Sequence, residues 1–153
     1  MEKNTKDKEY FNKNYVIVGK KGWGGTAKTY LINERKTAKK YLAKIIDIKY
    51  KDYYIKEAEF LDILNKQKNP NVIKKIGHGI GYIDRLNHEK EELQYIILEF
   101  ATHRELFDYI FYPNEGFGET LGKAIFAQIL NGVKGIHDLD YCHKDLSLSN
   151  IFL

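Results

Sequence analysis

The order of apolar and polar residues along the chain predicts a first region built mainly of β-strands. From Tyr15, short β-prone segments alternate with turn residues, which is typical of successive antiparallel strands. We expect five strands, at residues 15–20, 29–33, 39–47, 72–83 and 94–100. One helix over residues 52–68 interrupts them, because Glu57, Leu61 and Leu64 share one face at helical spacing and the sequence "NPN" follows.

Beyond residue 100 the pattern changes to the three-and-four spacing of helices. Residues 104–111 predict a short amphipathic helix and residues 118–139 a long one. The positions that define one face of the long helix are Ala124, Ile125, Gln128, Ile129, Val133 and Ile136. We therefore expect an α+β fold, with a five-stranded antiparallel lobe, a helical region, and a cleft at their junction near residues 99–102. Residues 1–14, rich in charge and asparagine, are expected to form a polar flexible lead.

Composition narrows the class of protein. The 153 residues are 43% hydrophobic and 14% aromatic, which is enough apolar material for a packed core. The net charge of +4 is spread along the chain, so we expect no nucleic-acid partner. Cys142 is the single cysteine, which excludes an internal disulfide and a cysteine zinc site. The chain begins without a signal peptide, and its apolar runs are shorter than the ~20 residues of a membrane span, so we expect no membrane association and a cytoplasmic or nuclear location.

The stretch "GWGGTAKTYL", residues 22–31, places glycines between the first two expected strands. Without Cβ atoms, the backbone N–H groups of such a hairpin can approach phosphate oxygens closely. Read as G-x-G-x-x-G-x-V, the pattern falls on Gly22, Gly24, Ala27 and Thr29. Taken alone, the stretch is explained equally well by a plain glycine turn. Its place between two strands, instead of before a helix, excludes a dinucleotide-binding fingerprint and a Walker A loop.

Lys44 lies in the middle of an apolar strand, "YLAKIID". Burial of its ammonium group is unfavourable unless a carboxylate or a phosphate meets it. Glu57 is the expected partner, because it shares the inward face of the next helix, whereas Glu59 points about 200° away from it. The alternative is that Lys44 and Glu57 are both exposed to solvent. The Gly-rich hairpin nearby in the sequence disfavours this alternative.

These motifs, followed by "HKDLSLSNIFL" at residues 143–153, resemble the signature set of eukaryotic protein kinases. The Gly-rich hairpin, the strand lysine, the helix glutamate, "NPNVIK", the last strand and hinge "YIILEFA", and the H-x-D-x-x-x-x-N loop occur in the family's order. The resemblance implies a protein kinase-like fold, with a small lobe at residues 15–98 and the hinge and first large-lobe helices at 99–153. It also implies ATP and Mg²⁺ as cofactors and a protein substrate phosphorylated on Ser or Thr.

By the same resemblance, each matched residue has an expected role. Asp145 accepts the proton of the substrate hydroxyl, and Lys44, held by Glu57, contacts the α- and β-phosphates. The nucleotide-binding residues are Gly22, Gly24, Ala27, Thr29, Leu42, Lys44, Leu98, Glu99, Ala101 and Glu105. Asn150 is the expected Mg²⁺ ligand, and His143 is expected to support the loop. Cys142 as a thiol nucleophile is the weaker alternative, because no orienting group is evident beside it.

Several positions depart from the family pattern. Leu42 replaces the alanine expected over the adenine ring, which predicts a narrower adenine slot. Thr29 replaces a valine there and brings a hydroxyl that needs a partner. Lys144 replaces the arginine of H-R-D, whose bidentate guanidinium commonly binds a phosphorylated activation loop in this family. The sequence therefore disfavours control by such phosphorylation. Ser147 replaces the lysine typical of Ser/Thr kinases, but the loop also lacks the Ala and Arg of tyrosine kinases, so Ser/Thr specificity is still expected.

The 153 residues contain no D-F-G motif, which the family places beyond the loop asparagine. We therefore expect a kinase domain truncated after the catalytic loop, poorly stable alone and inactive in phosphoryl transfer as it stands. A non-catalytic kinase-like scaffold or nucleotide-binding module is the alternative. A nucleic-acid-binding module is disfavoured, since the sequence shows neither a basic stripe nor a stacking platform.

Overall fold

The computed structural model describes residues 10–23, 25–84, 91–111 and 116–153. The strands are β1 (Tyr10–Phe11), β2 (Tyr15–Trp23), β3 (Ala27–Glu34), β4 (Lys40–Ile46), β5 (Lys75–Asp84) and β6 (Glu91–Glu99). The helices are α1 (Lys51–Gln67), α2 (Leu106–Phe111) and α3 (Glu119–His137), with 3-10 turns η2 (Ile48–Tyr50) and η3 (Leu148–Asn150). The five strands and three helices expected from the sequence are thus confirmed.

The chain divides into two compact units. The first unit holds the described residues up to Asp62 together with Lys74–Phe100, and the second unit holds Ile63–Ile73 together with Ala101–Leu153. The chain therefore crosses from one unit to the other at 62–63, at 73–74 and at 100–101.

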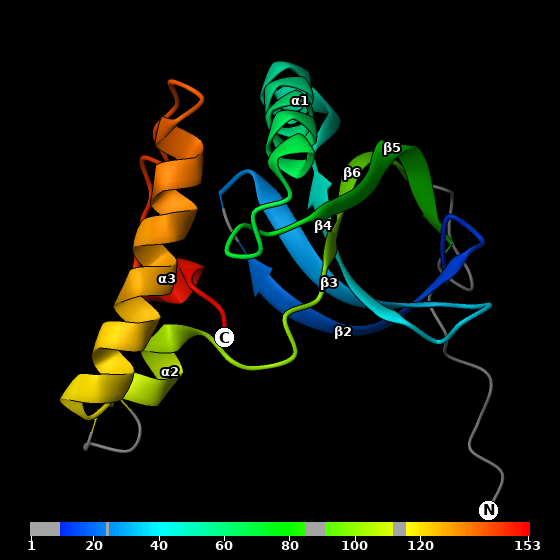
Figure 1. The fold of residues 1–153 in the computed structure, drawn as a ribbon. Coiled ribbons are helices and arrows are strands. Elements are labelled where there is room, and N and C mark those ends of the chain that lie inside the picture. Colours follow the sequence, from blue (N-terminus) through cyan, green and yellow to red (C-terminus); the bar gives the residue numbers. More distant parts are fainter. Residues whose placement is uncertain (1–9, 24, 85–90, 112–115) are drawn as a thin grey trace, which may run out of the picture. The chain divides into compact units, whose positions relative to one another are not determined.

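The strands of the first unit form a closed antiparallel barrel in the order β1-β2-β3-β4-β6-β5 (Figure 1). Side chains alternate between its two faces, and those that point inward make the core. The buried core residues are Phe11, Tyr30, Ile32, Tyr41, Ala43, Ile45, Ile83, Leu93 and Ile97, with Tyr15, Ile17 and Tyr95 packed against them. These aromatic and β-branched residues suit a half-buried pleated surface.

Strand β1 corrects the prediction of a polar flexible lead for its last residues. Phe11 pairs with Tyr15 on β2 and with Ile83 on β5, so that this short segment closes the barrel. The Phe11 side chain is fully buried, and its ring meets the Tyr95 ring edge-on at 4.8 Å between centroids. A two-residue strand has no readable period, which is why the sequence pattern missed it. Residues 1–9 of the expected lead lie outside the described residues.

Small residues on β5 make room for this closure. Gly79 is paired with Tyr95, and Gly81 follows on the same inner face. A Cβ atom on Gly79 would lie 3.0 Å from the Tyr95 hydroxyl, and one on Gly81 would overlap the Asn12 side chain. Asn12 also binds the neighbouring strand, since the Tyr82 N–H donates to its Oδ1 at 3.1 Å. The glycines of "GHGIGY" thus serve the packing of the N-terminal segment.

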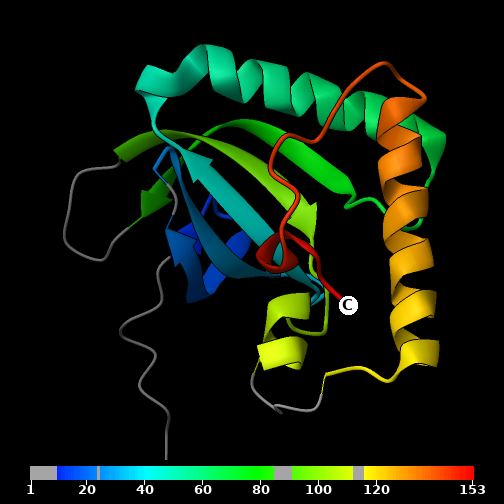
Figure 2. The same cartoon turned by 90° about the vertical axis from the view of Figure 1, so that its left-hand side faces the viewer.

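Helix α1 lies along the outer side of the barrel (Figure 2). Asp47 caps the preceding turn η2 by accepting a hydrogen bond from the Lys49 N–H at 3.1 Å. The inward face of α1 carries the buried residues Tyr54, Ala58, Leu61 and Leu64. The helix ends where Lys68 adopts a left-handed conformation with φ of 54°.

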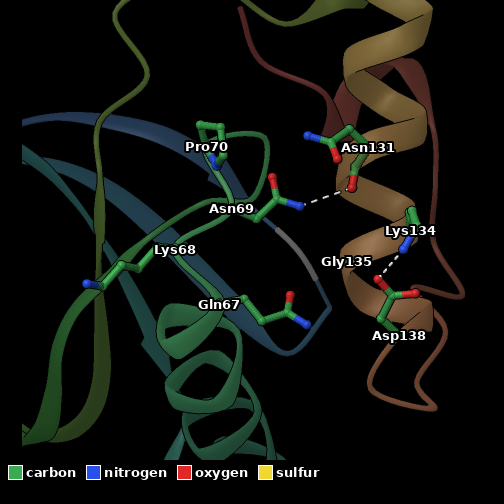
Figure 3. A pocket seen from close by; sticks show the side chains of 8 residues that line it. All are labelled: Gln67, Lys68, Asn69, Pro70, Asn131, Lys134, Gly135 and Asp138. Atoms are coloured by element: carbon green, nitrogen blue, oxygen red, sulfur yellow. Dashed lines mark hydrogen bonds and ion pairs between the residues drawn. The ribbon is translucent and has the colours of Figure 1, made fainter.

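The second unit is built around α3. Gly132 and Gly135 are buried on this helix and allow the loop at residues 69–71 to approach its backbone. The Asn69 amide donates to the Asn131 carbonyl at 3.0 Å (Figure 3), and the Asn131 amide donates to Asn71 Oδ1 at 2.8 Å. Among the described residues, no helix combines the length and the apolar character that a membrane crossing needs.

Candidate nucleotide and catalytic site

Four of the predicted nucleotide-binding residues lie on the outer face of the first unit's barrel. Thr29 on β3 lies directly opposite Lys44 on β4. In the adjacent cross-strand row, Leu42 lies opposite Leu98 on β6. Directly opposed residues in antiparallel strands point to the same face, so these four side chains share one surface, turned away from the core.

The Gly-rich hairpin lies at one end of this surface. Gly22, on β2, is opposite Thr29. A Cβ atom built on Gly22 or Gly25 would meet no atom of the described structure within 4 Å, and neither residue has a positive φ. The fold itself therefore imposes no need for glycine at these positions, which is consistent with a ligand that approaches the backbone. Ala27 begins β3, and Gly24 lies outside the described residues.

Lys44 and Glu57 form the expected ion pair. The Lys44 Nζ lies 2.6 Å from Oε1 and 2.8 Å from Oε2 of Glu57. Both side chains are 22% exposed, so the charges are screened by water less than a surface pair. Tyr53, one helical turn before Glu57, places its ring 5.4 Å from the Lys44 ammonium. This cation–π contact was not predicted from the sequence, because the local pattern does not indicate which of Tyr53 and Tyr54 faces Lys44.

The end of β6 is held to the segment that leads into β5. The Glu99 N–H donates to the Lys74 carbonyl at 2.9 Å, and the Lys74 N–H donates to the Glu99 carboxylate at 2.8 Å. Glu99, an expected hinge residue, therefore uses both its backbone and its side chain to order the last strand. Ala101, the next expected hinge residue, is the first residue of the second unit beyond this strand.

The second unit contains the loop predicted to be catalytic. The Asn150 amide nitrogen donates to both the carbonyl and the carboxylate of Asp145, at 2.8 and 3.0 Å. The Asp145 N–H donates to His143 Nδ1 at 3.3 Å, and Lys144 between them has a φ of 62°. This local network orients an Asp145 carboxylate that stays exposed to solvent.

The loop is joined to α2 by main-chain hydrogen bonds. The Leu106 N–H donates to the Ile151 carbonyl at 2.7 Å, and Glu105 forms a β-bridge with Phe152. Glu105, the predicted ribose contact, is thus next to the segment that follows Asn150. Within the second unit the structure joins Asp145 to Asn150 and places Glu105 beside Phe152. Within the first it places Thr29, Leu42, Lys44 and Leu98 on one face of the sheet, where Glu57 meets Lys44.

The donor set of the described residues fits Mg²⁺ only in part. The amide nitrogen of Asn150 donates its hydrogen bonds to Asp145, so the Oδ1 atom of Asn150 can serve as an oxygen ligand. No group of three or more His, Cys, Asp or Glu residues suited to a metal occurs in the part of the chain that the structure describes. Magnesium accepts few protein ligands when phosphates and water complete its octahedron, so one amide oxygen beside a carboxylate is compatible with it.

A hollow of about 500 Å³ lies in the second unit (Figure 3). Its lining consists of Gln67, Lys68, Asn69, Pro70, Asn131, Lys134, Gly135 and Asp138. The Lys134 ammonium lies 2.5 Å from the Asp138 carboxylate at its edge. None of the predicted site residues lines this hollow, so it is not part of the candidate site.

Comparison with known proteins covers the candidate residues of both units. A family model described as "Protein kinase domain" matches residues 15–153, from the first residue of β2 onward. The chain belongs to the protein kinase domain family. The strand lysine, the helix glutamate and the loop aspartate therefore lie within the matched region of a kinase domain.

Curated relatives of this kinase domain include serine/threonine kinases. The chain is 35% identical over 150 residues to the "Probable serine/threonine-protein kinase fhkD" of Dictyostelium discoideum, covering 95% of this chain and 19% of that protein. It is 30% identical over 149 residues to the "Maternal embryonic leucine zipper kinase" of Xenopus laevis, covering 96% of this chain and 21% of that protein. The chain thus spans about a fifth of the length of these two relatives.

A solved kinase structure shares the fold. The crystal structure of Rad53 residues 1–466 in complex with AMP-PNP superposes with a TM-score of 0.71 at 29% identity, covering 92% of this chain and 35% of that one. The α+β kinase fold expected from the sequence, a five-stranded antiparallel lobe followed by helices, is therefore confirmed.

Proposed function

We propose that the protein uses ATP to phosphorylate Ser or Thr hydroxyls of protein substrates. The observation that carries this proposal is the ion pair between Lys44 and Glu57 on the outer face of the barrel. A half-buried ammonium held by a carboxylate, with Gly22 and Thr29 in the adjoining strands, is a suitable contact for nucleotide phosphates. The Dictyostelium relative is described as a probable serine/threonine-protein kinase, and the Rad53 structure as a complex with AMP-PNP, which supports this assignment.

In this proposal the first unit binds the nucleotide. Leu42 and Leu98 offer apolar surface to the adenine, and the backbone of the Gly-rich hairpin approaches the phosphates. Lys44 neutralises charge on the α- and β-phosphates, while Glu57 fixes the orientation of its ammonium. Glu99 and Ala101 are the proposed hinge contacts of the base, and Glu105 the contact of the ribose.

The second unit is proposed to act on the substrate hydroxyl. The Asp145 carboxylate, oriented by the Asn150 amide, accepts the hydroxyl proton as the oxygen attacks. The Oδ1 atom of Asn150 is the proposed ligand of Mg²⁺, which when bound neutralises negative charge on the phosphates. His143 holds the Asp145 backbone and is proposed to have no proton-transfer role.

The test is transfer of labelled phosphate from ATP to a generic basic protein by the natural protein, including any residues that it carries beyond 153. Asp145→Asn should lower the rate by at least about 100-fold, since general-base catalysis typically contributes 10²–10⁴-fold. Asp140→Asn is the matched control: Asp140 is exposed, and asparagine tolerates its left-handed φ of 60°. Equal rates for the Asp145→Asn and Asp140→Asn proteins would reject the proposed role of Asp145.

We infer further that a polypeptide limited to residues 1–153 binds ATP but transfers no phosphate. Its sequence has no D-F-G aspartate, and phosphoryl transfer depends on metal ions that neutralise developing charge. Ser147, which stands where Ser/Thr kinases have lysine, favours the alternative of a non-catalytic nucleotide-binding module. ATP binding by the full chain with no transfer, under conditions in which a control kinase is active, would establish that alternative.

A further inference from the structure

Lys75, the first residue of β5, is a buried charge that the proposed mechanism does not use. Its side chain is only 3% exposed, compared with 22% for Lys44. Removal of an ammonium group from water is unfavourable by several kcal/mol unless its donors are paired, so the contacts of Lys75 must compensate for its burial.

Two contacts of the Lys75 ammonium lie on helix α1. Its Nζ donates to the Ala58 carbonyl at 2.8 Å and lies 2.6 Å from the Asp62 carboxylate. Ala58 and Asp62 are one turn apart on α1, so the ammonium meets the helix over a full turn. Such a contact restrains both the rotation of the helix and its position along its axis.

His78 supplies a third contact from the same strand. Its Nδ1 lies 2.9 Å from the Lys75 Nζ. An ammonium group has donors only, so Nδ1 accepts this hydrogen bond and carries no proton. The His78 ring lies 6.0 Å from the ring of Tyr54, a buried residue of α1. The hydrogen bond to His78 therefore helps to keep the Lys75 ammonium pointed toward α1.

These contacts adjoin the ion pair of the nucleotide site. Ala58, which accepts from Lys75, directly follows Glu57, which binds Lys44. Lys44 on β4 and His78 on β5 stand in one cross-strand row, on either side of Ile96 on β6. Two lysines of one sheet thus hold adjacent residues of the same helix.

We propose that Lys75 is a positioning residue of the nucleotide site, whose ammonium holds α1 at the rotation that brings Glu57 to Lys44. This inference rests on the proposed function, because it takes the Lys44–Glu57 pair as the phosphate-binding element. Lys75 donates to the helix backbone at Ala58, directly after Glu57, so it acts on the Lys44–Glu57 pair by holding α1.

The test is a double-mutant cycle on the full chain, with ATP affinity measured by calorimetry. Lys75→Met keeps the length of the side chain and removes its charge, and should weaken ATP binding about tenfold, which corresponds to about 1.4 kcal/mol. Lys75→Met combined with Glu57→Gln should bind ATP no more weakly than Glu57→Gln alone, since both changes act through one interaction. Additive losses, or an unchanged affinity with a lowered Tm, would assign Lys75 a merely structural role and overturn the inference.

Lys56→Met is the matched control, because it removes the same charge from the exposed side of α1 and should leave ATP affinity unchanged. If Lys75→Met does not fold, Asp62→Asn replaces it: this side chain is 52% exposed, and the change keeps its shape. Asp62→Asn should weaken ATP binding about threefold, as expected when one of several contacts is weakened.

A second measurement separates this inference from the proposed function. The rate at which acetic anhydride acetylates the Lys44 amine, followed by mass spectrometry, should rise when Lys75→Met releases Lys44 from Glu57. Faster acylation in a protein whose parent binds no ATP would support the positioning role and reject the proposed function. Unchanged acylation and unchanged ATP affinity in Lys75→Met would overturn the positioning role.

Discussion

Two adjacent lysines differ in burial, and their contacts explain the difference. Lys74 is exposed, whereas Lys75, the next residue, is buried with an ion pair to Asp62 and a hydrogen bond to α1. Lys44 is half-buried because the Glu57 carboxylate meets it across the sheet surface. In each case the carboxylate partner makes burial of the charge possible, since an unpaired ammonium would remain in water.

At the same scale, Leu42 is expected to limit ATP affinity. It is half-buried between Leu31 and Leu98 on the outer face, where the family has alanine. Leu42→Ala should strengthen ATP binding by up to about tenfold, because it removes side-chain volume from the proposed adenine slot. Calorimetry on the parent and the variant measures the change, with exposed Val18→Ala as the control for loss of apolar volume elsewhere in the barrel. Tighter binding by the parent would contradict the steric explanation.

At the scale of elements, the protein uses glycine where two backbones must approach. In the first unit, Gly79 and Gly81 accommodate Tyr95 and Asn12 inside the barrel. In the second unit, Gly132 and Gly135 on α3 accommodate the loop at residues 69–71. A helix glycine is intrinsically unfavourable by about 1 kcal/mol relative to alanine, so packing must offset this cost at Gly132 and Gly135.

Two glycines of α3 provide a matched pair of substitutions. A Cβ atom on Gly132 would lie 2.7 Å from the Asn71 carbonyl oxygen, whereas one on Gly122 would meet no described atom within 4 Å. Gly122→Ala should stabilise the protein by about 0.5–1 kcal/mol through helix propensity. Gly132→Ala should be less stable than Gly122→Ala by about 1–3 kcal/mol, because the loop backbone must move. Urea unfolding of both proteins measures the difference in their free energies of unfolding. Equal values would show that the loop at residues 69–71 can move without a loss of stability.

At the scale of the whole molecule, the second unit exposes several large apolar side chains among the residues that the structure describes. Phe126 and Leu130, four residues apart on α3, are 60% and 52% exposed. Phe107 and Phe111 of α2 are also exposed, and their rings stack with centroids 4.3 Å apart. Adjacent exposed apolar side chains favour association with other apolar surfaces.

A polypeptide of residues 1–153 is therefore expected to self-associate. Light scattering during size-exclusion chromatography should show an average mass that rises with concentration, because association buries the face of α3 around Phe126 and Leu130. Phe126→Lys should shift the polypeptide toward the monomer, whereas Lys123→Ala, on an exposed polar position of the same helix, should not. A parent polypeptide that is monomeric at all concentrations would rule out this role of the exposed face.

The sequence by itself determined the elements and the motif order. Alternation predicted β2 to β6, helical spacing predicted α1 to α3, and the partner of Lys44 followed from local position and from family resemblance. These features depend on residues close in the chain or on spacing within one element, so they can be read without coordinates.

Only the tertiary structure decided which residues of similar local pattern are buried. Phe11 in an otherwise polar segment becomes fully buried because β2 and β5 pair with it, and Lys75 becomes buried because Asp62 and the Ala58 carbonyl meet it. Gly132 is required in its helix by a loop sixty residues earlier. Each outcome depends on a partner far away in sequence, and burial energies arise from such long-range contacts instead of from local pattern.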